Sequence, residues 1–270
     1  MATVQTLTLQ TERMQASVEN GIGWMVFNNP ARHNALSLEM WEGIGDILEH
    51  FADNEDVRVI IMRGAGGKAF VSGADISEFD KERANAAQRE SYGITAGRAT
   101  QWLAKIEKPL IGLIEGYCIG GGLATALSAD VRFATPDSRF GIPAAKLGLG
   151  YEYEGLAKLA RLVGPSRARD IMFSARFMPA REALDMGLIN FIEERDDIEG
   201  ACVSYAKTIA ENAPLTVEAA KAAINAWERG SRTEEVNAVR AMVDACFDSE
   251  DYREGRKAFA AKRKPEFKNR

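Results

Sequence analysis

Two short glycine-containing segments are the parts of this chain best suited to binding a reacting oxygen atom. Residues 73–75 read Gly-Ala-Asp, and residues 120–122 read Gly-Gly-Gly directly after an apolar segment. Because glycine has no Cβ, an oxygen of a bound molecule can approach backbone N–H groups closely there. Two such N–H groups that face each other stabilise an oxygen that gains negative charge. The alternative is that these glycines serve only tight turns and close packing of a helix on a strand.

Side chains suited to proton transfer are few. The chain has two histidines, so neither a histidine-rich metal centre nor a Ser-His-Asp triad is favoured. We interpret His33 as a loop residue and His50 as a partner of a helix C-terminus. The segment 149–155, Leu-Gly-Tyr-Glu-Tyr-Glu-Gly, offers two acids, Glu152 and Glu154, either as catalytic carboxylates or as solvated loop residues. Its tyrosines are interpreted as pocket walls or a proton donor, with ordinary packing as the alternative.

Three widespread motifs are absent from the sequence. Lys68 is followed by alanine, so no phosphate-binding P-loop is formed, and residues 21–26 lack the third glycine of a dinucleotide-binding fingerprint. No Gly-x-Ser-x-Gly segment is present.

The three cysteines are far apart and have neither disulfide nor zinc spacing. Cys118, directly before the glycine triplet, is predicted to be a buried small apolar residue rather than a nucleophile.

The elements that must position these segments are predicted from hydrophobic periodicity. An Asn-Gly turn at residues 20–21 predicts a hairpin, and Ser37 is a candidate helix N-cap. Strands are predicted at 14–18, 22–27, 57–62, 110–114 and 131–134, and helices after 37, over most of 80–107 and at 120–129. This order predicts an α/β core with right-handed parallel crossovers. Residues 197–261 are predicted to be consecutive helices, interrupted at 212–214 and near 230.

The composition is that of a globular domain. Of 270 residues, 46% are hydrophobic and 27% charged, which excludes a disordered chain or a coiled-coil rod. The net charge of −5 and the pI near 5.4 argue against nucleic-acid or anionic-membrane binding. The N-terminus shows no secretory signal, and the most apolar stretch, 109–127, is interrupted by Glu115 and five glycines. We therefore expect a cytoplasmic protein.

Five segments together resemble the crotonase (enoyl-CoA hydratase/isomerase) superfamily. They are Asn-Pro-Ala-Arg-His-Asn-Ala-Leu at 29–36, Phe-Val-Ser-Gly-Ala-Asp at 70–75, Gly-Tyr-Cys-Ile-Gly-Gly-Gly at 116–122, Phe-Gly-Ile-Pro at 140–143, and Phe-Ala-Ala-Lys-Arg-Lys-Pro-Glu-Phe at 259–267. Each segment alone is a weak signal. All five in order cover nearly the whole chain.

The resemblance implies an α/β fold, the crotonase spiral of ββα units, followed by C-terminal helices that form an oligomer. We expect a spiral core over 1–196 and an oligomerisation region over 197–270, assembled as a homotrimer or a dimer of trimers. It implies an acyl-CoA substrate, no separate cofactor and no metal, and an oxyanion hole for the thioester enolate. The hole's donors would be the backbone amides of Ala74 and Gly121. The residues that contact the substrate or its CoA moiety would be Ala35, Leu36, Ser72, Ala74, Asp75, Ile76, Gly120, Gly121, Phe259 and Lys262.

The sequence departs from the family's hydratases at the two positions that carry their catalytic glutamates. One follows the glycine triplet by two residues and the other follows Phe-Gly-Ile-Pro, and here they are Ala124 and Ala144. Hydration by the two-carboxylate mechanism is therefore not expected. Glu152 lies eight residues after Ala144, at an offset where other members of the superfamily carry an active-site carboxylate. We expect Glu152 to perform general acid/base catalysis, for isomerisation or other enolate chemistry.

Other functions remain open from the sequence. A CoA-binding or scaffold homologue without catalytic activity would also explain the loss of both glutamates. An RNA-binding relative is disfavoured by the net charge of −5.

Overall fold

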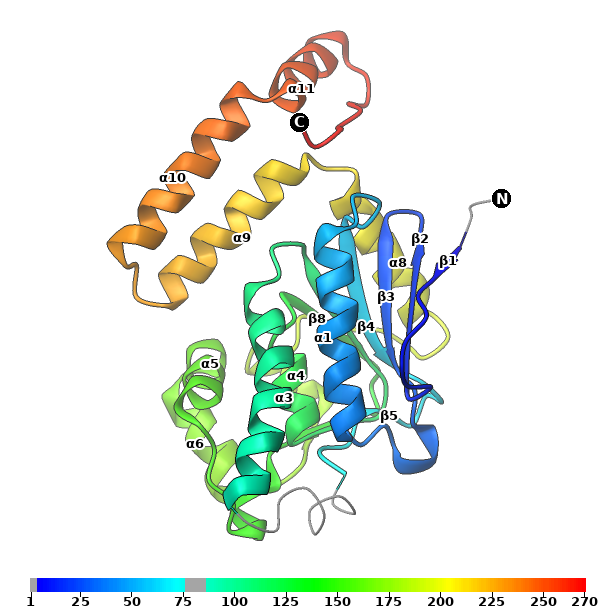
Figure 1. Ribbon diagram of the computed structural model, residues 1–270, viewed down its shortest axis with the longest axis vertical. Helices are drawn as coiled ribbons and strands as arrows, with labels where there is room; N and C mark the ends of the chain where they lie inside the picture. Colours follow the sequence, from blue (N-terminus) through cyan, green and yellow to red (C-terminus); the bar gives the residue numbers. More distant parts are fainter. Residues whose placement is uncertain (1–3, 76–85) are drawn as a thin grey trace.

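The computed structural model describes residues 4–75 and 86–270, and two β-sheets lie at the centre of this part (Figure 1). The larger sheet has the strand order β1-β2-β3-β4-β6-β8-β11, and the smaller has the order β10-β9-β7-β5. The strands of the larger sheet are β1 (Gln5–Thr6), β2 (Met14–Glu19), β3 (Ile22–Phe27), β4 (Val59–Gly64), β6 (Leu110–Ile114), β8 (Val131–Ala134) and β11 (Phe191–Ile192). Those of the smaller sheet are β5 (Ala69–Val71), β7 (Tyr117–Ile119), β9 (Arg139–Gly141) and β10 (Met178–Pro179).

The first hairpin forms where the sequence predicts it. Strands β2 and β3 pair antiparallel, with Glu19 opposite Ile22. The two turn residues, Asn20 and Gly21, have φ values of 52° and 81°. Asparagine and glycine tolerate this left-handed conformation, which matches the twist of the flanking strands.

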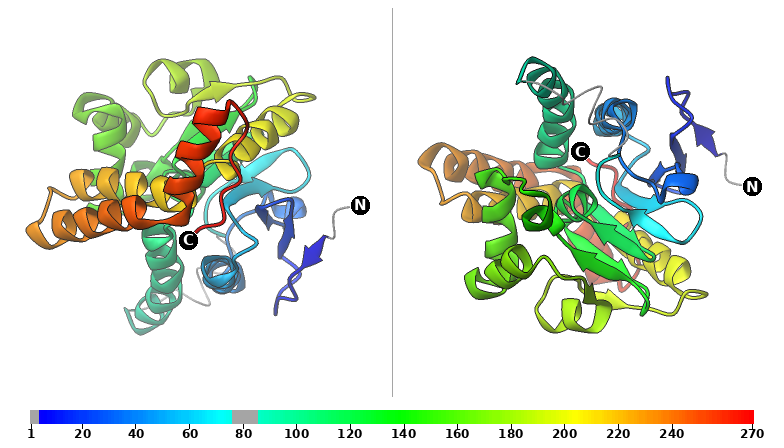
Figure 2. Two further views of the ribbon diagram at one scale, coloured as in Figure 1. Left: turned by 90° about the horizontal axis from the view of Figure 1, so that it is seen from above. Right: turned by 90° about the horizontal axis from the view of Figure 1, so that it is seen from below.

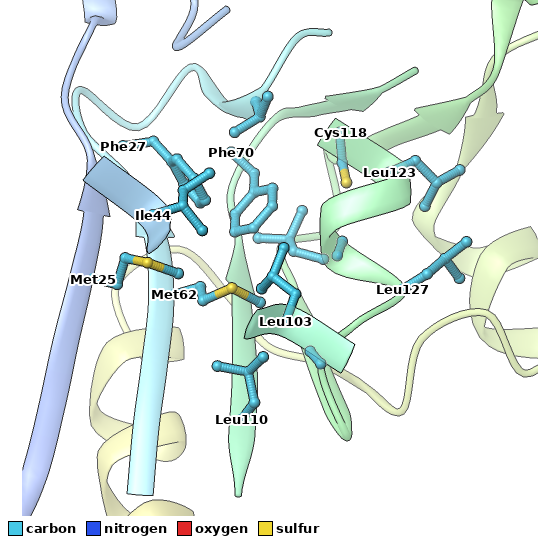
Figure 3. Close-up of a cluster of buried hydrophobic side chains, with 14 of the residues drawn as sticks. Met25, Phe27, Ile44, Met62, Phe70, Leu103, Leu110, Cys118, Leu123 and Leu127 are labelled. Carbon is cyan, nitrogen blue, oxygen red and sulfur yellow. The ribbon is translucent and has the colours of Figure 1, made fainter. Parts of the chain in front are cut away.

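From β3 onward the larger sheet is parallel, and its strands bury side chains on both faces. In β4, Ile60 and Met62 join one apolar cluster, part of which is shown in Figure 3, while Val59 and Ile61 join a second. The alternation follows from the two-residue period of a strand. Because both faces are covered by helices, residues 59–62 of β4 are a continuous apolar run, as expected of a strand in a parallel sheet. The predicted α/β fold is confirmed.

Helices α1 (Leu38–Asp53) and α3 (Ala86–Lys105) lie side by side over one face of the larger sheet (Figure 1), and α8 (Ile198–Ala210) packs on the other. Helix α1 begins directly after Ser37, as predicted, but the Ser37 hydroxyl makes no capping bond. Instead its oxygen is buried and has no hydrogen-bond partner among the described residues. Residues 80–85 of the predicted helix 80–107 lie outside the described residues.

Two predicted elements are longer than the observed ones. Helix α4 (Gly121–Ala126) ends before residue 129, because the amides of Ser128 and Ala129 bond to carbonyls three residues back. These tight turns redirect the chain into β8. Strand β4 begins at Val59 rather than at residue 57, because the Val57 amide bonds to the Asn54 carbonyl and closes a turn.

The rest of the chain is mainly helical. Its elements are the 3-10 helices η1 (Pro30–Arg32) and η3 (Pro143–Leu147), and the helices α5 (Tyr153–Val163), α6 (Pro165–Ser174), α7 (Ala180–Asp185), α9 (Pro214–Glu228), α10 (Thr233–Asp248) and α11 (Glu250–Ala261). Helices α9 and α10 pack side by side and extend away from the sheets (Figures 1 and 2). Within the described residues, none of the helices combines the length and apolar character that a membrane crossing requires.

The C-terminal helices contain one break that the sequence analysis missed. Ser249 separates α10 from α11, and its hydroxyl accepts a hydrogen bond of 2.9 Å from the Tyr252 amide. Beyond α11 the chain folds back along this helix. The buried carboxylate of Asp251 accepts hydrogen bonds from the amides of Lys268 and Asn269, which fixes the position of the tail.

Candidate active site

The first two sequence motifs meet as a short pair of parallel segments. The Leu36 amide donates to the Gly73 carbonyl over 2.8 Å, and the Asp75 amide donates to the Leu36 carbonyl over 2.8 Å. The Ser72 amide bonds to the His33 carbonyl at 3.1 Å. Leu36 and Ala74 thus form an isolated parallel bridge. This pairing fixes where the amide of Ala74 lies.

Asn34 holds the first motif in place. Its side chain is fully buried and bonds to the Asn29 amide and to the carbonyls of Ala65 and Ala69. Its φ of 55° is left-handed, a conformation that asparagine tolerates better than most residues. This side chain is therefore used for positioning the loop, and none of its polar atoms is needed for a ligand.

The glycine triplet brings the N-terminus of α4 to the same place. Gly120 has a φ of 56°, and its amide donates to the Gly141 carbonyl over 2.8 Å. A Cβ atom on Gly121 would lie 3.8 Å from the Ala74 amide nitrogen and 3.8 Å from Leu36 Cδ1. The amides of Ala74 and Gly121 therefore belong to adjoining backbone segments, with space for one small atom beside Gly121.

Gly122 has a different role. A Cβ atom there would lie only 2.1 Å from the Val71 carbonyl oxygen, so close packing of α4 on β5 excludes any side chain. The packing interpretation of the triplet therefore holds at Gly122. Packing requires the glycine at 122, whereas neither packing nor a left-handed φ requires one at 121.

Helix α4 is held at both ends. The buried Thr125 hydroxyl donates to the Gly121 carbonyl over 2.9 Å. At the other end, the buried Arg132 guanidinium donates to the Ala129 carbonyl and, over 2.8 Å, to the Leu188 carbonyl. Burial lowers the pKa of Arg132 to about 10, so the side chain stays charged at neutral pH. The guanidinium also donates to the carbonyl of Ala126, the last residue of α4, over 3.5 Å, and a cation at the C-terminal end of a helix is favourable.

The positions at which the family's hydratases carry glutamates are alanines here. Ala144 is buried and Ala124, in α4, is half-buried. Glu152 is the residue before α5 and is exposed, as is Glu154 in the first turn of that helix. Within the described residues, this chain alone therefore does not enclose Glu152, the residue expected to perform general acid/base catalysis. Tyr151, which the sequence analysis left as pocket wall, proton donor or packing, is half-buried with its hydroxyl near Gly120.

Not every residue expected at the site gathers there within one chain. Phe259 and Lys262 are exposed at the end of α11, which lies at the top of the molecule in Figure 1, far from β5 near the bottom. Ala35 is buried beside Leu36, and Ile76 lies outside the described residues. His33 is a loop residue at the end of η1, as predicted.

Cys118 is fully buried, and this burial raises the pKa of its thiol far above the ordinary value. A thiol that keeps its proton is a poor nucleophile. The expectation that Cys118 is a small apolar core residue is confirmed.

Comparison with known proteins identifies the family. Residues 17–270 match the family model described as enoyl-CoA hydratase/isomerase. The chain belongs to the enoyl-CoA hydratase/isomerase family. It is 34% identical over 256 residues to the short-chain-enoyl-CoA hydratase of Clostridium acetobutylicum, which covers 93% of this chain and 96% of that protein.

Two further relatives show how broad this family is. The methylmalonyl-CoA decarboxylase of Escherichia coli is 30% identical over 253 residues, covering 92% of this chain and 95% of that protein. A solved enoyl-CoA hydratase/carnithine racemase of Magnetospirillum magneticum is 37% identical, with a TM-score of 0.90 and 97% of each chain covered. The crotonase fold and its C-terminal helices are therefore confirmed, whereas relatives of similar identity carry names of different reactions.

Proposed function

We propose that this protein binds an acyl-CoA thioester and stabilises its enolate between the backbone amides of Ala74 and Gly121. The observation that supports this most directly is the approach of the two segments, which leaves Gly121 open where neither packing nor backbone conformation needs a glycine. Amides fixed by secondary structure need no reorganisation when negative charge develops on the thioester oxygen.

Water addition by a pair of glutamates is not part of the proposal. Ala124 and Ala144 can neither accept a proton nor orient a water molecule. Sequence identity does not select another reaction, because a hydratase at 34% and a decarboxylase at 30% are almost equally similar. Among reactions through an enolate, double-bond isomerisation fits a single acid best. One carboxylate can remove a proton at one carbon and return it at another.

Glu152 is the carboxylate that we propose for this proton transfer. It directly precedes α5, on the same loop as Tyr151, whose hydroxyl lies near Gly120. Its side chain is exposed in the unliganded chain. The apolar surroundings that favour proton exchange with carbon would therefore be completed by the bound acyl chain.

The test is exchange of the α-proton of a saturated acyl-CoA, such as butyryl-CoA, in deuterium oxide. This assay needs no knowledge of the natural acyl group. We expect the parent to exchange the proton and Glu152→Gln to lose about 10²–10⁴ in rate, the usual contribution of general acid/base catalysis. Affinity for the acyl-CoA should change little. Glu154→Gln is the matched control, because it makes the same change two residues away at another exposed position.

Equal exchange by the parent and Glu152→Gln would remove Glu152 from the mechanism. Loss of exchange in Glu154→Gln but not in Glu152→Gln would assign the proton transfer to Glu154.

A second candidate is an acyl-CoA-binding scaffold without catalysis, which the two alanines at 124 and 144 favour. Turnover of a panel of acyl-CoAs separates the two proposals. If every thioester binds and none reacts or exchanges its α-proton, the scaffold is correct.

The proposed assembly is a homotrimer or a dimer of trimers. Helices α9–α11 expose several large apolar side chains and line a groove of about 650 Å³; the exposed ones include Ile224, Trp227, Phe247 and Phe259. Burial of such a surface between subunits would be favourable. It would also let Phe259 and Lys262 reach the CoA nucleotide of a neighbouring subunit. Light scattering of the full chain gives the oligomeric state directly.

A further inference from the structure

The hydroxyl of Tyr151 reaches the corner where the two glycine segments meet. A Cβ atom on Gly120 would lie 3.8 Å from this hydroxyl oxygen and 3.8 Å from Gly73 Cα. Gly120 directly precedes Gly121, and Gly73 directly precedes Ala74. The phenol oxygen therefore lies near Gly120, and Gly120 lies near Gly73, so the hydroxyl is close to the residue that precedes Gly121.

The surrounding loop directs this ring inward. Tyr151 is half-buried and packs against the larger apolar cluster, whereas Leu149, Gly150 and Glu152 are exposed. The loop is fixed on either side of the ring. The Leu149 amide bonds to the Ala144 carbonyl over 3.0 Å, and the Leu156 amide bonds to the Glu152 carbonyl over 3.4 Å as α5 begins. A tyrosine side chain also has only two χ angles, so little entropy is lost in holding its hydroxyl there.

A phenol at this place can donate a hydrogen bond to the substrate. The phenolic O–H of a tyrosine is a hydrogen-bond donor. Ala124 and Ala144, at the positions of the hydratase glutamates, supply no polar group. The charge of an enolate is shared between its oxygen and its α-carbon, so a donor beside the two amides would stabilise it further.

We propose that Tyr151 is a catalytic residue whose hydroxyl donates a hydrogen bond to the enolate oxygen of the bound thioester, as a third donor beside Ala74 and Gly121. The proton stays on the phenol, and no bond forms or breaks at this residue. Removal and return of the substrate proton remain the role of the carboxylate. This inference rests on the proposed function, because it requires a thioester oxygen between the two amides.

Tyr151→Phe removes the hydroxyl and keeps the ring. Tyr153→Phe is the matched control, because it makes the identical change two residues away, where the side chain is 74% exposed. With butyryl-CoA in deuterium oxide, we expect Tyr151→Phe to lower the α-proton exchange rate by about 10²–10³, the effect of losing one donor to an oxyanion. Tyr153→Phe should match the parent.

A vibrational measurement distinguishes a hydrogen bond from packing. Butyryl-CoA labelled with ¹³C at the thioester carbonyl should show a lower carbonyl stretching frequency when bound to the parent than in water, because the donors polarise the bond. The bound frequency should rise in Tyr151→Phe and stay unchanged in Tyr153→Phe. A purely structural tyrosine would alter affinity or stability and leave this frequency as in the parent.

The possible results separate this inference from the proposed function. If Gly121→Ala loses exchange while Tyr151→Phe keeps both the parent's rate and its carbonyl frequency, the role of Tyr151 is refuted and the hole stands. If the parent neither exchanges the proton nor shifts the carbonyl frequency, both proposals are wrong. A loss of rate together with a raised frequency in Tyr151→Phe alone supports the inference.

Discussion

Gly121→Ala tests the oxyanion hole with a very small change to the fold. The added methyl carbon would lie 3.8 Å from the Ala74 amide nitrogen, 3.8 Å from Leu36 Cδ1 and 3.9 Å from the Gly73 carbonyl carbon. All three are ordinary van der Waals contacts, so no atom has to move. Gly121 is also the first residue of α4, where alanine is the better helix former. The free energy of unfolding should therefore be equal to or slightly above that of the parent.

The effect on activity should be large. The methyl group would stand beside the Gly121 amide and on the side of Ala74, where an oxygen must approach to bind both amides. If the methyl group displaces the thioester oxygen from one of the two amides, the rate should fall by about 10²–10³, which is roughly 2.7–4 kcal/mol of transition-state stabilisation. We expect α-proton exchange of butyryl-CoA to fall by this factor.

Gly122→Ala is the control for damage to the fold. Its methyl carbon would lie 2.1 Å from the Val71 carbonyl oxygen and 2.8 Å from the Val71 carbonyl carbon, so the backbone of α4 or β5 must shift. Such overpacking costs about 1–3 kcal/mol or more, which lowers the melting temperature by several degrees. Thermal unfolding and proton exchange would be measured on both variants. A Gly121→Ala protein with the parent's exchange rate refutes the assigned hole, and one as unstable as Gly122→Ala refutes the packing analysis.

Two further predictions concern charged side chains. Lys262→Glu should weaken CoA binding at low salt, and the difference from the parent should shrink as salt shortens the screening length below roughly 8–10 Å. Calorimetric titration at two salt concentrations checks this, with Lys257→Glu in the helix that Lys262 follows as control. Unchanged affinity at low salt would contradict the prediction. Burial lowers the pKa of Lys158 in α5, so the charged side chain is less favourable in the folded protein than in the unfolded chain. Lys158→Met should therefore raise the melting temperature at pH 7 by about 2–4 °C for each kcal/mol gained, and the gain should diminish as the pH rises through the folded pKa and the parent lysine loses its proton.

The sequence predicted the elements whose signals are local. The strands β3, β6 and β8 and the Asn20-Gly21 turn form where predicted, because alternation and turn residues act over a few neighbours. The predicted ends of the helices are wrong where a local hydrogen bond ends one helix early or begins another. Tight turns after Ala126 end α4 early, and the Ser249 hydroxyl starts a new helix within a continuous helical pattern.

The site itself depends on contacts between segments far apart in the chain. No local pattern shows that the Leu36 amide bonds to the Gly73 carbonyl, or that Gly121 approaches Ala74. Only the resemblance placed these segments together. In the acidic loop, the sequence drew attention to Glu152 because of its charge, whereas the structure directs the neighbouring Tyr151 toward the glycines. Which of two adjacent side chains turns inward depends on the loop's anchor points, and these have no signature in composition.

The glycines also bear on the choice between an enzyme and a scaffold. At Gly116 a Cβ atom would lie 2.0 Å from the Lys68 carbonyl oxygen, and Gly73 has a φ of 117°, so the fold itself requires glycine at both positions. Gly121 has neither reason, and alanine is the better helix former. A binding protein that only holds CoA would be more stable with alanine there. The glycine at position 121 is explained if the thioester oxygen must contact the Gly121 amide. Such a contact is needed in a site that stabilises negative charge on that oxygen.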